Sequence, residues 1–103
     1  MTFEEKITRG RAQWIVSFET HEEDDNLEMR LTQEPELETI HRILKFTGVS
    51  NMESSWEDRD DECLETIISA NEMLSKSQPR YFFHTDQREI SIDTAKRVEI
   101  NDV

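Results

Sequence analysis

Residues 12–32, AQWIVSFETHEEDDNLEMRLT, contain two runs in which apolar and polar side chains alternate. The first run would place four apolar side chains on one face of a strand, namely Ala12, Trp14, Val16 and Phe18. In the second run, Leu27, Met29 and Leu31 alternate with polar residues. Alternation with a period of two on both sides of a polar loop predicts an antiparallel hairpin.

Upstream of this hairpin the sequence predicts a short helix over residues 3–9. Thr2 and Glu5 have the spacing of a capping box, and Gly10 follows as a typical C-terminal residue. An extended segment is the alternative, because seven residues form a marginal helix.

Downstream of the hairpin we expect two longer helices. Thr32 would cap the first, which carries an apolar stripe at helical spacing and ends at Gly48. That stripe consists of Leu37, Ile40, His41 and Leu44. The second helix would begin after Ser54 or Ser55 and reach about Lys76.

Beyond Pro79 three short stretches alternate, at residues 80–84, 89–93 and 97–100. They predict a β-meander of two or three strands. The expected fold is therefore a single α+β domain over residues 1–103. It would have a mostly antiparallel sheet, made of the N-terminal hairpin and the C-terminal meander, with two main helices packed on one face.

The chain is strongly acidic, with 24 Asp and Glu against 12 Lys and Arg and a net charge of −12. The excess lies in residues 19–38 and 53–72. Such a field repels nucleic acid and anionic membranes and attracts basic partners. The single Cys63, the lack of a signal-peptide pattern and the lack of an 18-residue apolar run lead us to expect a cytoplasmic protein.

On the second predicted helix, six carboxylates would form a stripe beside the apolar seam. They are Glu57, Asp58, Asp61, Glu62, Glu65 and Glu72. A solvated helix flank is one interpretation, and acids in the first turn are favoured by the helix dipole. The other is a partner-binding surface, in which carboxylates in rows stand in for the phosphates of a nucleic acid.

Four more acids occupy the predicted hairpin loop: Glu22, Glu23, Asp24 and Asp25. They could be a solvated tip that discourages edge association, an extension of the binding surface, or a weak cation site. Neither acidic segment has the spacing of an EF-hand, and the histidines lack metal-ligand spacing in the sequence. We therefore expect no metal and no cofactor.

The aromatic cluster Tyr81, Phe82 and Phe83 has apolar side chains on both faces of its predicted strand. Burial beneath the N-terminal segment would explain it, and so would an interface with a partner or a second copy. Catalysis is not expected. Cys63 has acidic neighbours that disfavour a thiolate, and His41 belongs to a core stripe.

The sequence thus favours a non-enzymatic acidic protein that inhibits or regulates a basic partner, such as a nucleic-acid-binding protein or a nuclease. In size and charge alone it is similar to small nucleic-acid mimics, including phage-encoded anti-defence inhibitors. The alternatives are an immunity protein or antitoxin for a basic toxin, and a small structural subunit.

Overall fold

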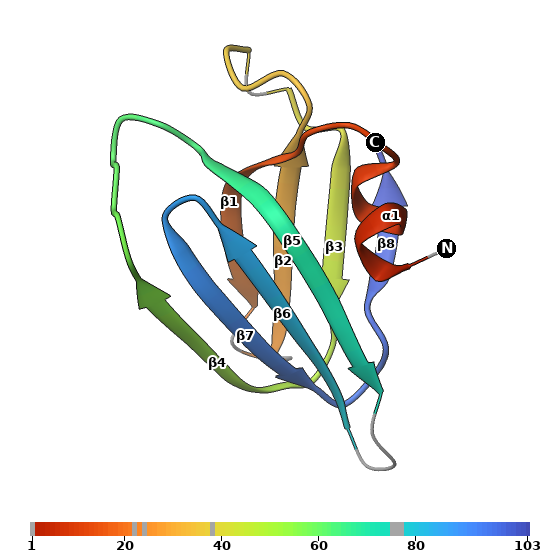
Figure 1. Cartoon of the computed structure of the whole chain (residues 1–103). Coiled ribbons are helices and arrows are strands. Elements are labelled where there is room, and N and C mark those ends of the chain that lie inside the picture. Colours follow the sequence, from red (N-terminus) through yellow and green to blue (C-terminus); the bar gives the residue numbers. More distant parts are fainter. Residues whose placement is uncertain (1, 22, 24, 38, 75–77) are drawn as a thin grey trace.

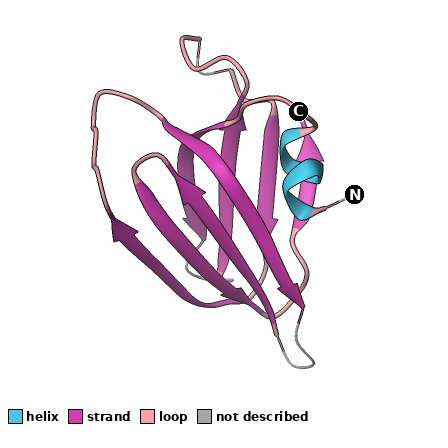
Figure 2. Ribbon diagram, viewed as in Figure 1, coloured by secondary structure: helices cyan, strands magenta, loops and turns pink. Residues whose placement is uncertain are grey.

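The computed structural model describes residues 2–21, 23, 25–37, 39–74 and 78–103. Within these residues the chain forms one short helix and eight β-strands (Figures 1 and 2). Strands hold 58% of the chain and helix only 6%, so the predicted α+β fold with two main helices is wrong. In the described part of the chain, no helix combines the length and apolar character needed to cross a membrane.

The elements follow one another as α1 (Phe3–Thr8), β1 (Trp14–His21), β2 (Asn26–Thr32), β3 (Arg42–Phe46), β4 (Val49–Trp56), β5 (Glu65–Leu74), β6 (Pro79–Thr85), β7 (Arg88–Thr94) and β8 (Glu99–Asp102). The strands form one sheet in the order β4-β7-β6-β5-β1-β2-β3-β8. Every described pairing is antiparallel.

The sheet bends so that its two halves face each other across the core. The bend lies between β5 and β1, which pair through only two residue pairs. In Figure 1, β5, β6 and β7 lie in front of β1, β2 and β3. The ring of Phe46 on β3 lies 5.4 Å from that of Tyr81 on β6, and Phe3 of α1 lies 5.2 Å from Tyr81. These aromatic contacts join the two layers and the helix.

The N-terminal helix and hairpin are confirmed. The Thr2 hydroxyl accepts a hydrogen bond from the Glu5 amide at 3.1 Å, as the capping pattern predicted. β1 pairs with β2 along its whole length, but the register shifts between Ile15 and Ser17. Because of this bulge, Ile15 is the buried residue of β1, and the predicted core residue Trp14 is only half-buried.

The helix α1 is held on the sheet by Arg42 of β3, which is almost fully buried. Its guanidinium donates to the carbonyl of Ile7 and, at 2.8 Å, to the carboxylate of Asp102 on β8. Arg9, at the end of α1, forms an ion pair with the same carboxylate at 2.9 Å. A cation at the helix C-terminus is favourable because the last carbonyls lack intrahelical partners.

The first predicted main helix does not form. Leu37, which should have faced the core, is 72% exposed in a loop, and β3 follows with Leu44 and Phe46 buried. Gly48 then turns the chain with φ +67°, and an added Cβ would lie 2.6 Å from the Cβ of Ala95. This glycine marks a tight β3–β4 turn and not a helix end.

The second predicted helix does not form either. Its described residues form the end of β4, a loop over residues 57–64, and β5, whereas residues 75 and 76 lie outside the described part of the chain. A register shift in β5 between Ile67 and Ser69 places Glu65, Ile67 and Ala70 on the buried side. This bulge breaks the period of two, and the resulting spacing imitates that of a helix.

The strands of the predicted C-terminal meander exist, but they do not form one continuous meander. β6 and β7 pair as a hairpin. β8 instead crosses to the other end of the sheet and pairs with β3. β8 is therefore the edge strand of the layer that contains the N-terminal hairpin.

Candidate docking surface

The six carboxylates predicted to share one helix face are divided between two environments. Glu57, Asp58, Asp61 and Glu62 lie in the loop between β4 and β5. Glu65 and Glu72 lie on β5 itself. The predicted stripe of carboxylates on one helix face therefore does not exist. The loop carboxylates and the β5 carboxylates have to be assessed separately.

We call residues 57–62 the acidic loop. It holds five carboxylates and one arginine, and all six residues are exposed. Arg59 pairs with Asp61 at 3.0 Å and also lies 4.9 Å from the centre of the Trp56 ring. The other four carboxylates have no described lysine or arginine within ion-pair distance. The loop thus presents uncompensated negative charge to solvent.

A buried side chain fixes the acidic loop in place. Gln87, in the β6–β7 turn, is only 4% exposed. Its carbonyl accepts from the amides of Glu57 and Asp58 at 2.8 and 3.0 Å. Its side-chain oxygen accepts from the Asp60 amide at 3.1 Å, and its side-chain nitrogen donates to the Cys63 carbonyl at 3.0 Å. Sequence reasoning missed Gln87, because these contacts exist only once β6 and β7 lie beside the loop.

Cys63 is exposed and directly follows the acidic loop. A hydrogen bond with Asp60 and the charge of that carboxylate raise the pKa of the Cys63 thiol above its ordinary 9.0. The thiolate is the nucleophilic form of cysteine, so this environment disfavours reactivity.

Glu65 is part of the fold's interior. Its carboxylate accepts two hydrogen bonds from Arg88, both at 2.8 Å, and one from the Thr85 hydroxyl at 3.0 Å. The side chains of Glu65 and Arg88 are each 11% exposed. Arg88 also stacks between the rings of Trp56, at 4.3 Å, and Phe18, at 5.1 Å. Glu65 is therefore unavailable to a partner.

Glu72 is likewise neutralised within the chain. Arg97, in the segment before β8, donates to both of its carboxylate oxygens at 2.9 and 3.1 Å. The Glu72 side chain is only 10% exposed. The predicted binding residues on β5 thus serve as internal ion-pair partners.

The hairpin tip lies apart from the acidic loop. Of its four acids, Glu22 and Asp24 are outside the described residues, whereas Glu23 and Asp25 are exposed. The Asp25 carbonyl accepts from the amide of Val49, at the start of β4, at 2.7 Å. The acidic loop begins after the other end of β4, so the length of this strand separates the two acidic segments.

Of the three aromatic residues on β6, only one is accessible. Tyr81 and Phe83 belong to the core, whereas Phe82 is half-buried on the outer face. Tyr81 and Phe83 therefore cannot form the interface that was one interpretation of this cluster. Phe3 of α1 packs on both of their rings, which agrees with the alternative of burial beneath the N-terminal segment.

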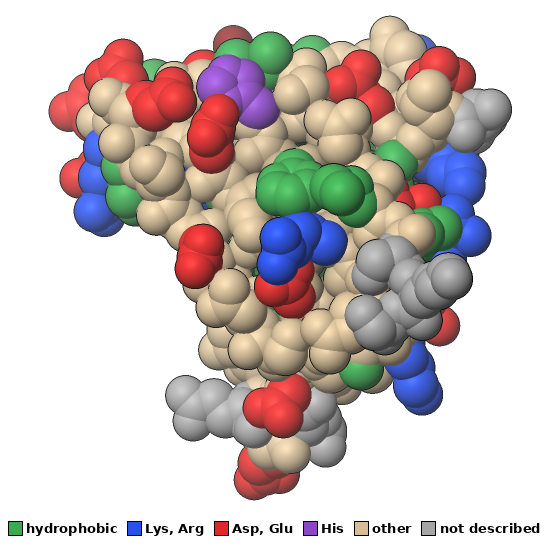
Figure 3. All heavy atoms as spheres, turned by 60° about the horizontal axis from the view of Figure 1, so that its bottom comes forward, with side chains coloured by type: hydrophobic (Ala, Val, Ile, Leu, Met, Phe, Trp, Pro, Cys, Tyr) green, Lys and Arg blue, Asp and Glu red, His purple; other side chains and the backbone are tan. Residues whose placement is uncertain are grey.

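Phe82 lies in an open groove of about 910 Å³ on the outer face of β4, β7, β6 and β5. Around it the groove is lined mainly by short polar and charged side chains, among them Glu53, Ser69, Arg80 and His84. Figure 3 shows this side of the molecule obliquely, with acidic side chains spread over it and a histidine among them. The groove ends next to the acidic loop, since Ser54 and Ser55 of β4 line it.

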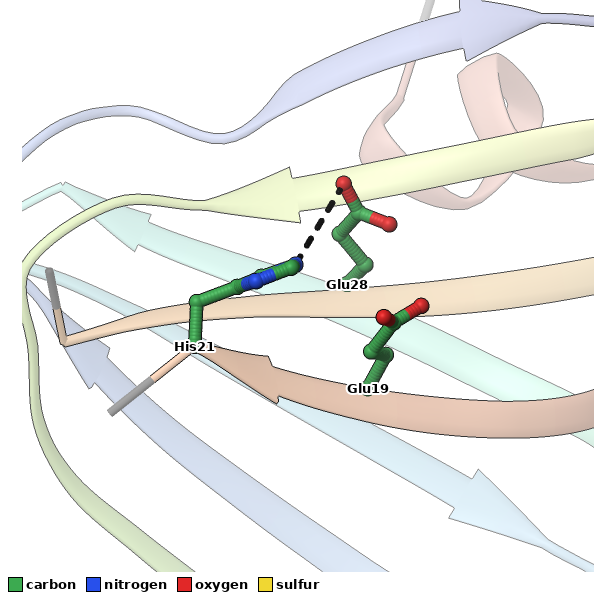
Figure 4. Close-up of side chains that lie close together, drawn as sticks. All are labelled: Glu19, His21 and Glu28. Atoms are coloured by element: carbon green, nitrogen blue, oxygen red, sulfur yellow. Dashed lines mark ion pairs between the residues drawn. The ribbon is translucent and has the colours of Figure 1, made fainter. Parts of the chain in front are cut away.

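Two clusters of one histidine and two glutamates have donor atoms within 4.8 Å of one another. Glu19, His21 and Glu28 lie side by side on the β1–β2 hairpin, and the ring of His21 points towards Glu28 (Figure 4). Glu57, His84 and Glu89 form the second cluster, where the groove meets the acidic loop. Sequence spacing predicted neither cluster, because strand pairing brings their members together. The third histidine, His41, accepts a hydrogen bond from the Gln33 amide at 3.1 Å and has a structural role.

Comparison with known proteins finds no family model that matches the chain, and no match among curated proteins or solved structures.

Proposed function

We propose that this chain is a non-enzymatic binding domain that docks its acidic loop on a basic surface of a partner protein. One observation carries the proposal: the loop's carboxylates are exposed and largely uncompensated, yet its backbone is fixed by Gln87. Binding by a loop that is already ordered loses less conformational entropy than binding by a flexible acidic tail.

The partner class follows from the charge. A net charge of −12 steers basic proteins towards the domain and repels nucleic acid itself. Proteins that bind or cut nucleic acids have clusters of Lys and Arg for phosphate contacts, and we propose such a protein as the target. Docking there would inhibit or regulate it. An immunity protein or antitoxin would use the same loop against a basic toxin.

The structural-subunit alternative has less support. It relied on an aromatic strand as an apolar interface, but Tyr81 and Phe83 are buried. Of the three aromatic residues, only Phe82 remains accessible, on the outer face of β6.

The test compares two charge reversals of equal size in the tagged, full-length chain. The loop variant is Asp58→Lys/Asp61→Lys/Glu62→Lys. Glu65 is left unchanged because its reversal would break the buried ion pair with Arg88. The control variant is Glu34→Lys/Glu36→Lys/Glu99→Lys, which changes three exposed acids outside the loop whose side chains form no ion pair with a described residue.

Both variants are first checked for folding by circular dichroism and then used to capture proteins from a native lysate at low salt. We expect the wild type and the control variant to retain the same basic protein, and the loop variant to lose it. The captured protein should also dissociate from the wild type at high salt, because salt screens exposed charges. Equal capture by all three chains, or capture that resists high salt, would contradict the proposal.

A further inference from the structure

Three strands bring Glu57, His84 and Glu89 together at one end of the outer groove. His84 on β6 and Glu89 on β7 are directly opposite in the antiparallel register. Glu57 follows Trp56, the last residue of β4, which pairs with Arg88 on β7. Nδ1 of His84 lies 3.6 Å from a carboxylate oxygen of Glu89, and the three donor atoms lie within 4.8 Å of one another. We propose that these three residues bind a divalent transition-metal ion of the Zn²⁺ type.

A second observation comes from the histidine itself. The Nδ1 atom of His84 is shielded from solvent and has no hydrogen-bond partner among the described residues, although the side chain as a whole is 38% exposed. Buried polar atoms nearly always have a partner, so one without any calls for an explanation. A metal ion bound at this nitrogen and at the facing carboxylate oxygen would supply the missing interaction.

The charge around the cluster also favours a cation. Among the described residues, no lysine or arginine lies within ion-pair distance of Glu57 or Glu89. The remaining carboxylates of the acidic loop follow Glu57 directly in the chain. A divalent ion would therefore reduce repulsion between carboxylates and would displace no described lysine or arginine.

The cluster on the β1–β2 hairpin differs in this respect. Arg30 contacts the carboxylate of Glu19 and lies 3.4 Å from that of Glu28. Its guanidinium already supplies the positive charge that a metal ion would bring. A metal ion at Glu19, His21 and Glu28 would have to compete with Arg30, so we expect this cluster to remain unoccupied.

The donor set determines the kind of ion. One imidazole nitrogen and two carboxylate oxygens suit Zn²⁺ and similar ions, whereas Ca²⁺ and Mg²⁺ prefer oxygen ligands alone. Ligand atoms around tetrahedral Zn²⁺ lie about 3.3–3.6 Å apart, given bond lengths of about 2.0–2.2 Å. Glu89 is 64% exposed, and Glu57 is exposed as well, so both side chains can move towards His84. The fourth position would be open to water.

The experiment measures Zn²⁺ binding to the isolated chain by competition with a fluorescent zinc chelator. The main variant is His84→Gln, with Glu89→Gln as a second variant if the first fails to fold. The matched control is His21→Gln, which alters the other cluster and leaves this one intact. We expect one equivalent of Zn²⁺ to bind to the wild type and to His21→Gln. Removing His84 or Glu89 should weaken binding at least about tenfold, because loss of even an outer-shell partner costs about 10–100-fold in metal affinity.

Absence of Zn²⁺ binding to the wild type would overturn the proposal. Equal binding by the wild type and His84→Gln would do so too, because it would indicate diffuse attraction to acids. A loss seen only with His21→Gln would assign the metal to the hairpin cluster instead. Excess Ca²⁺ should not displace the bound Zn²⁺. No partner protein takes part, so the result is independent of the proposed docking function.

Discussion

The acidic loop and strand β5 are neighbours in the sequence and both carry carboxylates, yet these carboxylates have opposite roles. In the loop they are exposed and mostly unpaired. On β5, Glu65 and Glu72 are nearly buried, and each accepts two hydrogen bonds from one arginine. The difference shows that this chain uses negative charge in two ways, as internal ion pairs and as free surface charge. Only the second kind is available to a partner.

The largest change in the free energy of unfolding should appear when Glu65 loses its charge. In Glu65→Gln the side chain keeps its shape, but the guanidinium of Arg88, whose side chain is 11% exposed, loses its carboxylate partner. Removing one member of a buried pair leaves an uncompensated charge, and we expect the free energy of unfolding to fall by about 3 kcal/mol. Urea denaturation followed by circular dichroism measures this change.

The control for that experiment is Glu62→Gln in the acidic loop, which removes the same charge from an exposed side chain. We expect it to change the free energy of unfolding by less than about 0.5 kcal/mol. If the two variants were equally stable, the distinction between loop and strand carboxylates would be wrong.

A second, smaller effect is the loss of stability at acidic pH. Two hydrogen bonds from Arg80 hold the pKa of the Asp93 carboxyl below its ordinary 3.8. A carboxyl group whose pKa is lower in the folded chain contributes stability that is fully present above its unfolded pKa. That contribution is lost as the pH falls through the folded value. Stability of the wild type should therefore decrease as the pH falls below about 4, and Asp93→Asn should lack this part of the decrease.

Urea unfolding at a series of pH values between about 5 and 2 tests this expectation. Asp58→Asn is the matched control, because Asp58 is exposed and pairs with no described cation. It should keep the acid dependence of the wild type. A steeper loss of stability in Asp93→Asn than in the wild type would contradict the role given to the Arg80 pair.

The sequence predicted the strands that alternate cleanly and missed those that do not. β2, β6 and β7 have alternating apolar residues, and the helix α1 has a capping box. β3 was missed because the buried position 42 is an arginine, which interrupts the apolar pattern. β5 was missed because its bulge shifts the period. β4 was missed because this edge strand is mostly exposed and carries few apolar residues.

The candidate docking surface was predictable only where it depends on local charge. Four of the six proposed acids, at positions 57, 58, 61 and 62, are exposed as expected. The other two were assigned to that surface in error, since their arginine partners lie 23 and 25 residues further along the chain. Such pairs follow from strand order, which a single sequence with a wrong helix prediction could not provide. The same holds for Gln87 and for the cluster around His84.

The smallest effect is expected when the acidic loop is neutralised without reversing its charge. In Asp58→Asn/Asp61→Asn/Glu62→Gln the amide side chains keep the size of the originals, and the loop's anchor, Gln87, bonds to main-chain groups that are unchanged. Loss of the Arg59–Asp61 pair removes little, because both side chains are exposed. Relief of repulsion between carboxylates acts in the opposite direction, so the stability of the variant should stay close to that of the wild type.

The stability of this variant should also depend less on salt than that of the wild type. Fewer repelling charges remain to be screened over a Debye length of about 10 Å at 0.1 M. Urea denaturation at low and high salt measures both quantities. A large loss of stability would mean that these carboxylates support the fold, as Glu65 does, and the acidic loop would no longer qualify as a free docking surface.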